Sequence, residues 1–145
     1  MQRDTVEIRE GSWEALGAQA TEIRHLVFIE EQGVSREEEW DGRDGECHHF
    51  LALLNGRPVG TARLLPDAHI GRVAVLAGAR GHGIGAALMH AAIEAARRHG
   101  HAVVELASQT HALEFYARLG FAAHGPEFLD AGIPHRNMRL LLGDR

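Results

Sequence analysis

Short alternating and apolar runs in the first half of the chain predict strands. Residues 6–9 alternate apolar and polar side chains, which is the period of a strand with one buried face. Two further apolar runs, residues 49–54 and 58–65, flank the dipeptide Asn55-Gly56. Because Asn and Gly tolerate the positive φ angles of a two-residue turn, this pattern predicts a β-hairpin.

A helical spacing of apolar residues follows the first predicted strand. Ser12 is a suitable N-cap, since its hydroxyl can accept a hydrogen bond from the first helical turn. Gly33 is a stop signal for the same helix. The apolar positions that share one face are Leu16, Ala20, Ile23 and Val27. We therefore expect one amphipathic helix between Ser12 and Gly33.

The second half of the chain alternates predicted strands and helices. The expected elements are strands over residues 70–76 and 103–107, near Phe121 and over 137–142, and helices over 83–99 and 111–119. The two strands on either side of the longer helix form a βαβ unit and should run parallel. The whole order predicts a mixed α/β (α+β) fold, in which a mixed central sheet is flanked by helices.

The composition fits a single domain over residues 1–145. With 45% hydrophobic and 24% charged residues, the chain can bury one core. No apolar run reaches the about 20 residues of a membrane-spanning helix, and the N-terminus lacks the apolar core of a secretion signal, so we expect a cytoplasmic protein without membrane contact. All 15 basic residues are arginines, which excludes chemistry that needs an enzyme lysine.

Negative charge is concentrated in residues 30–46, called here the acidic segment. Only Arg36 and Arg43 balance its carboxylates, and the net charge of the chain is −5. Such a surface is a poor partner for nucleic acid. Two interpretations of the segment stay open: it attracts a cationic amine, or it is a solvated face.

A glycine-rich turn before the long helix is the main candidate for ligand binding. This turn, called here the phosphate turn, comprises Arg80, Gly81, His82, Gly83, Ile84, Gly85 and Ala86. Free amides and the positive end of the helix dipole favour a pyrophosphate there, and glycines let the backbone approach the phosphates. Arg80 adds a positive charge. A helix start that only needs flexible residues is the alternative.

A dinucleotide cofactor is a second interpretation of this turn. Residues 81–86 fit the pattern G-x-G-x-x-G/A, and Glu105 follows about 20 residues later on the next predicted strand. In the dinucleotide fold, however, the first glycine directly follows the strand, whereas residues 77–80 intervene here. The remaining about 40 residues are also few for a doubly wound sheet.

Two motifs in this order resemble the GNAT acetyltransferases. Residues 72–75, the R-x-x-G-x-G turn and the following helix look like motif A of that superfamily, and residues 115–121 are similar to its F-Y-x-x-x-G-F signature. Residues 27–32 and 132–135 resemble the ElaA-like branch. The resemblance covers nearly the whole chain. It implies a splayed sheet in which the strands before and after the motif A helix part and CoA enters the gap.

The resemblance also implies roles for the cofactor residues. The backbone of Val73, Ala74 and Val75 would pair with the pantetheine arm of acetyl-CoA as another strand would. The amides of residues 81–86 would wrap the pyrophosphate, and His82 would add a polar contact. Acetyl-CoA is therefore the expected co-substrate.

Candidate catalytic residues follow from the same resemblance. Tyr116 matches the family tyrosine that protonates the departing CoA thiolate, although its ring could simply pack with Phe115 and Phe121. The general base stays open between ordered water and several side chains. The candidates are Glu31 and His135 in the two ElaA-like motifs, Glu105 on the strand that lines the gap, and Glu39 and Asp41 in the acidic segment.

No metal is expected. The single cysteine, Cys47, supplies neither a disulfide nor a set of thiolates, and the neighbouring His48 and His49 point to opposite faces of a strand.

These features together predict transfer of an acetyl group from acetyl-CoA to a primary amine of a small molecule or peptide. Direct attack by the amine needs no serine or cysteine nucleophile. The alternatives are a non-catalytic acyl-CoA-binding sensor and an NAD-dependent oxidoreductase. An exposed edge strand near the C-terminus would permit a homodimer.

Overall fold

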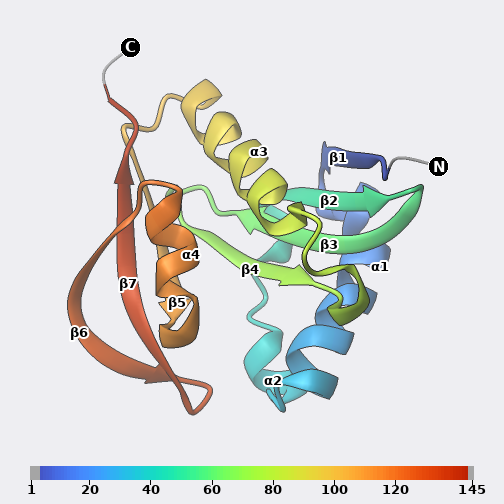
Figure 1. Ribbon diagram of the computed structural model, residues 1–145, viewed down its shortest axis with the longest axis horizontal. Helices are drawn as coiled ribbons and strands as arrows, with labels where there is room; N and C mark the ends of the chain where they lie inside the picture. The colour runs from blue at the N-terminus through green and yellow to red at the C-terminus, as the bar shows by residue number, and fades with distance from the viewer. Residues whose placement is uncertain (1–3, 144–145) are drawn as a thin grey trace.

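The computed structural model describes residues 4–143, whose strands divide between two sheets (Figure 1). The four-stranded sheet has the order β1-β2-β3-β4 and the three-stranded sheet the order β5-β7-β6. The strands are β1 (Val6–Gly11), β2 (His48–Leu54), β3 (Arg57–Leu64), β4 (Ile70–Val75), β5 (Val103–Gln109), β6 (Ala122–Asp130) and β7 (Ile133–Leu141). The helices are α1 (Trp13–Arg24), the π-helix η1 (His25–Glu31), α2 (Arg36–Glu39), α3 (Ile84–Arg98) and α4 (Leu113–Arg118).

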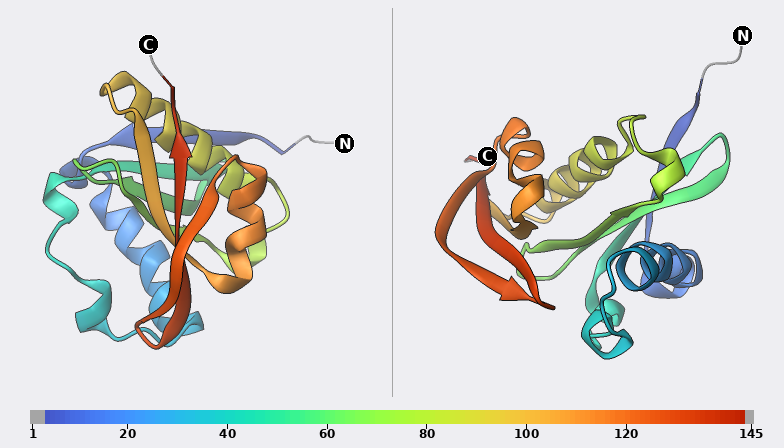
Figure 2. Two further views of the ribbon diagram at one scale, coloured as in Figure 1. Left: turned by 90° about the vertical axis from the view of Figure 1, so that its left-hand side faces the viewer. Right: turned by 60° about the horizontal axis from the view of Figure 1, so that its bottom comes forward.

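Two helices cover opposite faces of the four-stranded sheet, as the right-hand view of Figure 2 shows. α3 packs on the face that carries Phe50 and Ala52, and α1 packs on the face that carries Leu51 and Leu53. Because successive residues of a strand point to opposite faces, a strand between two helices is apolar along its length. We call these faces the α3 side and the α1 side.

The predicted β-hairpin is confirmed. β2 and β3 pair antiparallel with Leu54 opposite Arg57. Asn55 and Gly56 connect them with φ angles of 53° and 82°. Positive φ at both central residues is the geometry of the type I′ turn that Asn-Gly favours.

The first helix has the predicted ends. Ser12 is its N-cap and accepts a hydrogen bond from the Ala15 amide at 3.2 Å, and Gly33 follows it with a φ of 75°. Between them α1 changes into the wider π-helix η1, a change that the apolar spacing does not predict.

β4 and β5 meet at one end and then part. A parallel bridge pairs His69 with Glu105, and the Glu105 amide donates to the Ala68 carbonyl at 3.1 Å. β4 then continues beside β3, and β5 continues beside β7, both antiparallel. The parallel βαβ unit and the splayed sheet are therefore confirmed, and the division between the two sheets lies at this point.

The C-terminal hairpin is longer than the sequence predicted. β7 begins at Ile133, and Ala131 and Gly132 form the preceding turn with φ angles of 52° and 74°. Residues 132–135, which resemble an ElaA-like motif, thus form part of this turn and the start of β7. β6 is the outer strand of its sheet, which matches the edge strand expected near the C-terminus.

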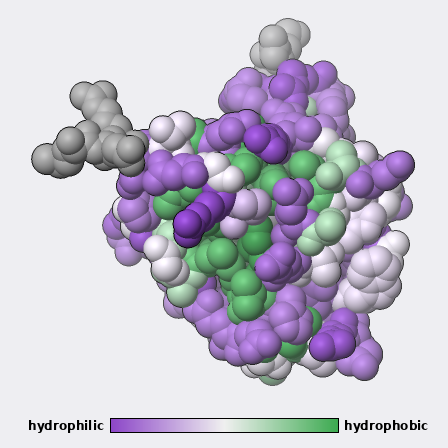
Figure 3. All heavy atoms as spheres, turned by 90° about the vertical axis from the view of Figure 1, so that its right-hand side faces the viewer, coloured by the Kyte–Doolittle hydropathy of each residue, from purple (hydrophilic) through white to green (hydrophobic). Residues whose placement is uncertain are grey.

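The surface is mostly hydrophilic, with apolar residues gathered in the middle of the face shown in Figure 3. The most exposed large apolar side chains are those of Leu129, Leu141 and Trp40. Across residues 4–143, no helix has the length and apolar character needed to cross a membrane.

Candidate active site

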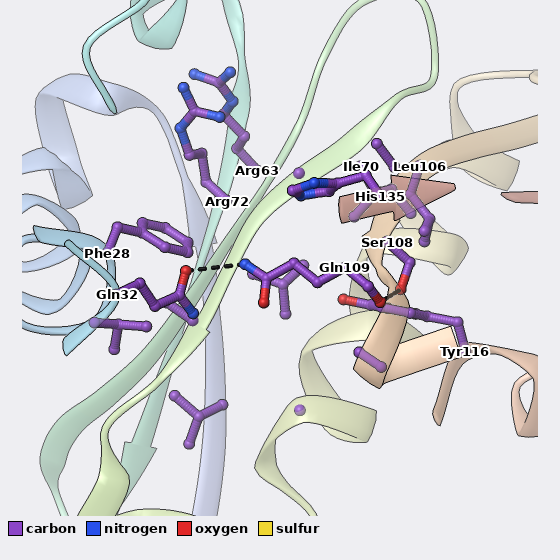
Figure 4. A pocket seen from close by; sticks show the side chains of 18 of the residues that line it. Phe28, Gln32, Arg63, Ile70, Arg72, Leu106, Ser108, Gln109, Tyr116 and His135 are labelled. Atoms are coloured by element: carbon purple, nitrogen blue, oxygen red, sulfur yellow. Dashed lines mark hydrogen bonds between the residues drawn. The ribbon is translucent and has the colours of Figure 1, made fainter. Parts of the chain in front are cut away.

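A central cleft lies where β4 and β5 part. Its volume is about 1230 Å³, and it is lined by β4, the phosphate turn, β5, α4, β7 and the segment that follows α1. Figure 4 shows Tyr116 and His135 on one wall and Phe28 and Gln32 on the other. The cleft brings together the three predicted catalytic residues, Tyr116, Glu31 and His135, and all the predicted cofactor residues except His82.

The phosphate turn presents backbone amides to the cleft. Gly81 and Gly83 have φ angles of 87° and 75°, and a Cβ added to either would meet open space. Gly83 is the N-cap of α3 and provides no side-chain cap, so amides of the first turn remain free for an anion. Gly85 differs, because a Cβ there would lie 3.3 Å from Cζ of Phe115. Gly85 therefore permits the packing of α4 against α3.

Arg80 and Glu31 form a pair at the cofactor end of the cleft. Nη1 and Nη2 of Arg80 donate to Oε2 and Oε1 of Glu31 at 2.7 and 2.6 Å, and Nε donates to the Val75 carbonyl at 3.0 Å. The hydrogen bonds from Arg80 lower the pKa of Glu31. A carboxylate held in this way is a weak base. In the same turn, His82 Nδ1 lies 3.1 Å from Asp4 Oδ2.

β4 has an edge beside the cleft that is not paired with another strand, and its Val75 carbonyl accepts a hydrogen bond from Arg80. Its other edge pairs with β3, where Thr61 lies opposite Ala74 and Gly60 opposite Val75. Val73 and Val75 pack toward the α3 side and Ala74 toward the α1 side. In the described part of the chain, no strand pairs with residues 73–75 on the side of β5. This free edge fits the strand-like pairing that the resemblance implies for the pantetheine arm.

Tyr116 lies on α4 and lines the cleft. Its ring packs edge-on against Phe115 and Phe121, with centroids 4.9 and 6.1 Å away. In Figure 4 its hydroxyl points into the cleft beside Gln109. Burial raises the pKa of Tyr116 to about 12. The packing and acid interpretations are therefore compatible, because the neighbours orient a hydroxyl that keeps its proton at neutral pH.

His135 faces the cleft from β7 and is only 8% exposed. Its Nδ1 donates to the Ile133 carbonyl at 2.6 Å, and its ring stacks on Phe128 at 5.9 Å between centroids. Since a carbonyl oxygen can only accept, this bond fixes the proton on Nδ1 and leaves the lone pair of neutral imidazole on Nε2. Nε2 is therefore the nitrogen of the neutral ring that can accept a proton.

The other proposed bases have charged partners. Glu105 Oε1 accepts from Arg139 Nε at 3.1 Å, and Glu105 does not line the cleft. Glu39 pairs with Arg24, and Asp41 pairs with Arg63.

Most carboxylates of the acidic segment are exposed, as the solvated-face interpretation expects, but Asp44 belongs to a buried ion network. Asp44 is fully buried and accepts from Arg24 Nη1 and Nη2 at 2.7 and 3.2 Å and from Arg63 Nη1 at 2.9 Å. Burial would raise the pKa of Asp44, but the hydrogen bonds from both arginines lower it. Hydrogen bonds from Arg63 also hold the pKa of Asp41 well below its usual range. Glu39, Asp41 and Asp44 are thus each paired with an arginine, and Asp44 is closed to solvent.

The cysteine and histidines at the start of β2 have other partners than a metal. His48 Nε2 lies 2.9 Å from Glu10 Oε1, whereas His49 Nε2 donates to the Asp44 carbonyl at 2.9 Å on the opposite face. Cys47 is buried. Over the residues whose positions are described, no group of three or more His, Cys, Asp or Glu side chains could hold a metal.

Comparisons with known proteins agree with this geometry. A family model described as an acetyltransferase (GNAT) domain matches residues 16–142. A Bacillus subtilis protein described as an acetyltransferase is 38% identical over 122 residues, which cover 80% of this chain and 83% of that protein. Protein ElaA of Escherichia coli is 31% identical over 125 residues, which cover 81% of this chain and 82% of ElaA.

Two solved structures have the same fold. A Lactobacillus plantarum protein described as an N-acetyltransferase has a TM-score of 0.87 and 31% identity, over 95% of this chain and 99% of that one. The crystal structure of Escherichia coli ElaA has a TM-score of 0.82 and 28% identity, over 94% of this chain and 99% of that one. The chain therefore belongs to the GNAT acetyltransferase family, as an ElaA-like member.

Proposed function

We propose that this protein transfers the acetyl group of acetyl-CoA to a primary amine of a small molecule or peptide. One observation carries the proposal: a free strand edge and an uncapped helix start lie at one end of a cleft that also holds Tyr116 and His135. The thioester of acetyl-CoA would supply an activated acyl carbon. The residues of the chain bind and orient it and move two protons.

The cofactor end of the cleft fits CoA. The amides of residues 81–86 hold the pyrophosphate, and the open space beside Gly81 and Gly83 leaves room for it. The backbone of residues 73–75 pairs with the amides of the pantetheine arm along the free edge of β4. We assign Glu31 to an ion pair with Arg80 at this end and not to proton transfer, because their fork-shaped pairing leaves the carboxylate little basicity.

His135 and Tyr116 move the protons of the reaction. His135 Nε2 accepts a proton from the ammonium group of the acceptor, which frees the nitrogen lone pair. The nitrogen attacks the acyl carbon, so that a C–N bond forms, the C–S bond breaks and the nitrogen loses its second proton to solvent. The Tyr116 hydroxyl gives its proton to the leaving thiolate and regains one from solvent. Oriented amides beside β4 stabilise the negative charge on the carbonyl oxygen.

Two alternatives to acetyl transfer, a dinucleotide enzyme and an acyl-CoA sensor, differ from it in fold or in turnover. A dinucleotide enzyme needs a largely parallel doubly wound sheet, whereas the neighbours within both sheets of this chain run antiparallel. An acyl-CoA sensor would use the same site without turnover. It would bind acetyl-CoA and release no CoA with any amine.

A screen of primary amines with detection of free thiol tests the proposal. Cys47 is the only cysteine and is buried, so a thiol reagent on the native protein reports the release of CoA. We expect release that needs both acetyl-CoA and an amine. His135→Asn keeps a donor near the Ile133 carbonyl but lacks Nε2, and it should lower kcat/KM by about 100-fold at neutral pH. Full activity in this variant would assign the base to water.

A further inference from the structure

One hydrogen bond crosses the central cleft from wall to wall. Gln109 Nε2, at the end of β5, donates to Gln32 Oε1, just after η1, at 2.9 Å (Figure 4). Both side chains line the cleft and are partly buried. The bond therefore occupies space between two segments that lie 77 residues apart in sequence.

Both residues of this bond make further hydrogen bonds, Gln109 through its side chain and Gln32 through its backbone. Gln109 Oε1 accepts from His111 Nε2 at 2.6 Å. The backbone N–H of Gln32 donates to the Val27 carbonyl at 3.1 Å, which is the five-residue spacing of a π turn. With the turn in this register, Glu31 reaches Arg80 and Gln32 reaches Gln109. π turns are frequent at functional sites. In this one, two consecutive residues, Glu31 and Gln32, reach different parts of the cleft.

The bond lies next to η1, which packs on the α1 side of the sheet, while the neighbouring Glu31 reaches the phosphate turn at Arg80. Gln32 follows η1, whose Val27 and Phe28 pack on the α1 side together with Ala74. The phosphate turn leads into α3 on the other side. If CoA enters from the α3 side and its thioester lies in the gap, an amine has to approach from the α1 side. That approach passes the Gln32–Gln109 bond.

We propose that the Gln32–Gln109 hydrogen bond determines acceptor specificity by restricting the α1 side of the cleft to slender, unbranched primary amines. This inference rests on the proposed acetyl transfer. An amine with a bulky group beside its nitrogen has to break the bond before the nitrogen reaches the acyl carbon, whereas a linear chain passes beside it. The two glutamines are specificity residues and take no part in proton transfer.

Two variants of Gln32 distinguish the effect of losing the hydrogen bond from the effect of changing the residue. Gln32→Ala removes the oxygen that accepts the hydrogen bond from Gln109, and it widens the cleft. Gln32→Glu keeps the length and an acceptor oxygen, so Gln109 Nε2 still has a partner. Gln109→Ala opens the cleft from the other wall and should reproduce the effect of Gln32→Ala. Binding of S-ethyl-CoA by each variant shows that its cofactor side is intact.

Two readouts measure the restriction, one with turnover and one without. The first is the ratio of kcat/KM for cyclohexylamine to that for n-butylamine, two primary amines of similar basicity. The second is the ratio of calorimetric affinities for S-benzyl-CoA and S-ethyl-CoA, thioethers that cannot transfer an acyl group. A neutral hydrogen bond predicts that Gln32→Ala raises each ratio by about five- to tenfold. Gln32→Glu should leave both ratios near those of the native chain.

The outcomes separate this inference from the proposed function. Unchanged ratios in Gln32→Ala, or an equal rise in Gln32→Glu, would overturn the role of the bond while CoA binding still supported the cofactor site. If neither amine is a substrate, the thioether ratio alone decides. If the native chain binds neither thioether, the proposed function fails and this inference fails with it.

Discussion

The two sides of the central cleft are built in different ways. On the α3 side, the cofactor residues form two short consecutive segments, residues 73–75 and 81–86, which act through their backbone. On the α1 side, side chains from distant segments meet, as in the pairs Gln32–Gln109 and Arg63–Asp41. A backbone site suits a ligand shared by a whole family, whereas a side-chain site changes with single substitutions. We therefore expect the α3 side to select the acyl donor and the α1 side the acceptor.

Asp44→Ala should have the largest effect on the free energy of unfolding, because it removes the carboxylate at the centre of the ion network on the α1 side. Arg24 and Arg63 would stay buried without their shared carboxylate, and removing one partner of such a network lowers the free energy of unfolding by about 3–5 kcal/mol. Urea denaturation measures the loss. Glu7→Ala removes an exposed partner of Arg9 and should change the value by less than about 0.5 kcal/mol. If Asp44→Ala and Glu7→Ala changed the free energy of unfolding by equally small amounts, the stabilising role of the network would be contradicted.

The same network gives the α1 side a defined sensitivity to acid. The pKa values of Asp41 and Asp44 are lower in the folded chain than their ordinary values. Such carboxyl groups contribute stability above their unfolded pKa of about 4 and lose it as the pH falls through the folded pKa. The free energy of unfolding of the native chain should therefore fall below about pH 4. Asp44→Ala should show a shallower fall.

Tyr116→Phe tests the point at which the two sides meet. The substitution keeps the edge-on packing with Phe115 and Phe121 but removes the proton donor. We expect kcat to fall by about 100-fold, while the affinity for acetyl-CoA changes by less than about twofold. Steady-state kinetics and calorimetry on the same preparation measure both values. Unchanged turnover would leave Tyr116 with a packing role alone.

Glu31→Gln has the smallest expected effect and refines the assignment of Glu31 to the donor side. The variant frees Arg80 for the pyrophosphate, so the affinity for acetyl-CoA should rise by about two- to fivefold, the range of an exposed ion pair. kcat should stay within about twofold of the native value, because Glu31 is not the base in this account. A loss of kcat with unchanged affinity would instead make Glu31 the base.

The tight turns, the first helix cap and the α3 side of the cleft could be predicted from the sequence, because their residues have local backbone requirements. Asn55 and Gly56 in the hairpin and Gly81 and Gly83 in the phosphate turn adopt positive φ angles, and these residue types indicate such angles directly. The same holds for Ser12 as a cap. The resemblance then added the fold and Tyr116.

The acceptor side could not be predicted because its contacts depend on tertiary structure. Asp44 meets Arg24 and Arg63 at separations of 20 and 19 residues, and no pattern in the acidic segment marks it as buried. Glu31 was a candidate base because it lies in an ElaA-like motif, and that motif does not indicate its partner, Arg80, 49 residues further along the chain. The π turn that directs Gln32 toward Gln109 has no distinct apolar spacing.

Calorimetric titration with acetyl-CoA and with NADH tests the central claim, that the phosphate turn binds acetyl-CoA. The native chain is compared with Gly83→Asp and Gly83→Asn, which are nearly equal in size and both tolerate the left-handed backbone of this position. We predict binding of acetyl-CoA and not of NADH. The negative charge of Gly83→Asp should weaken that binding by at least about 100-fold, and Gly83→Asn by less than about tenfold. Binding of NADH in preference, or equal binding of acetyl-CoA by both variants, would contradict the account.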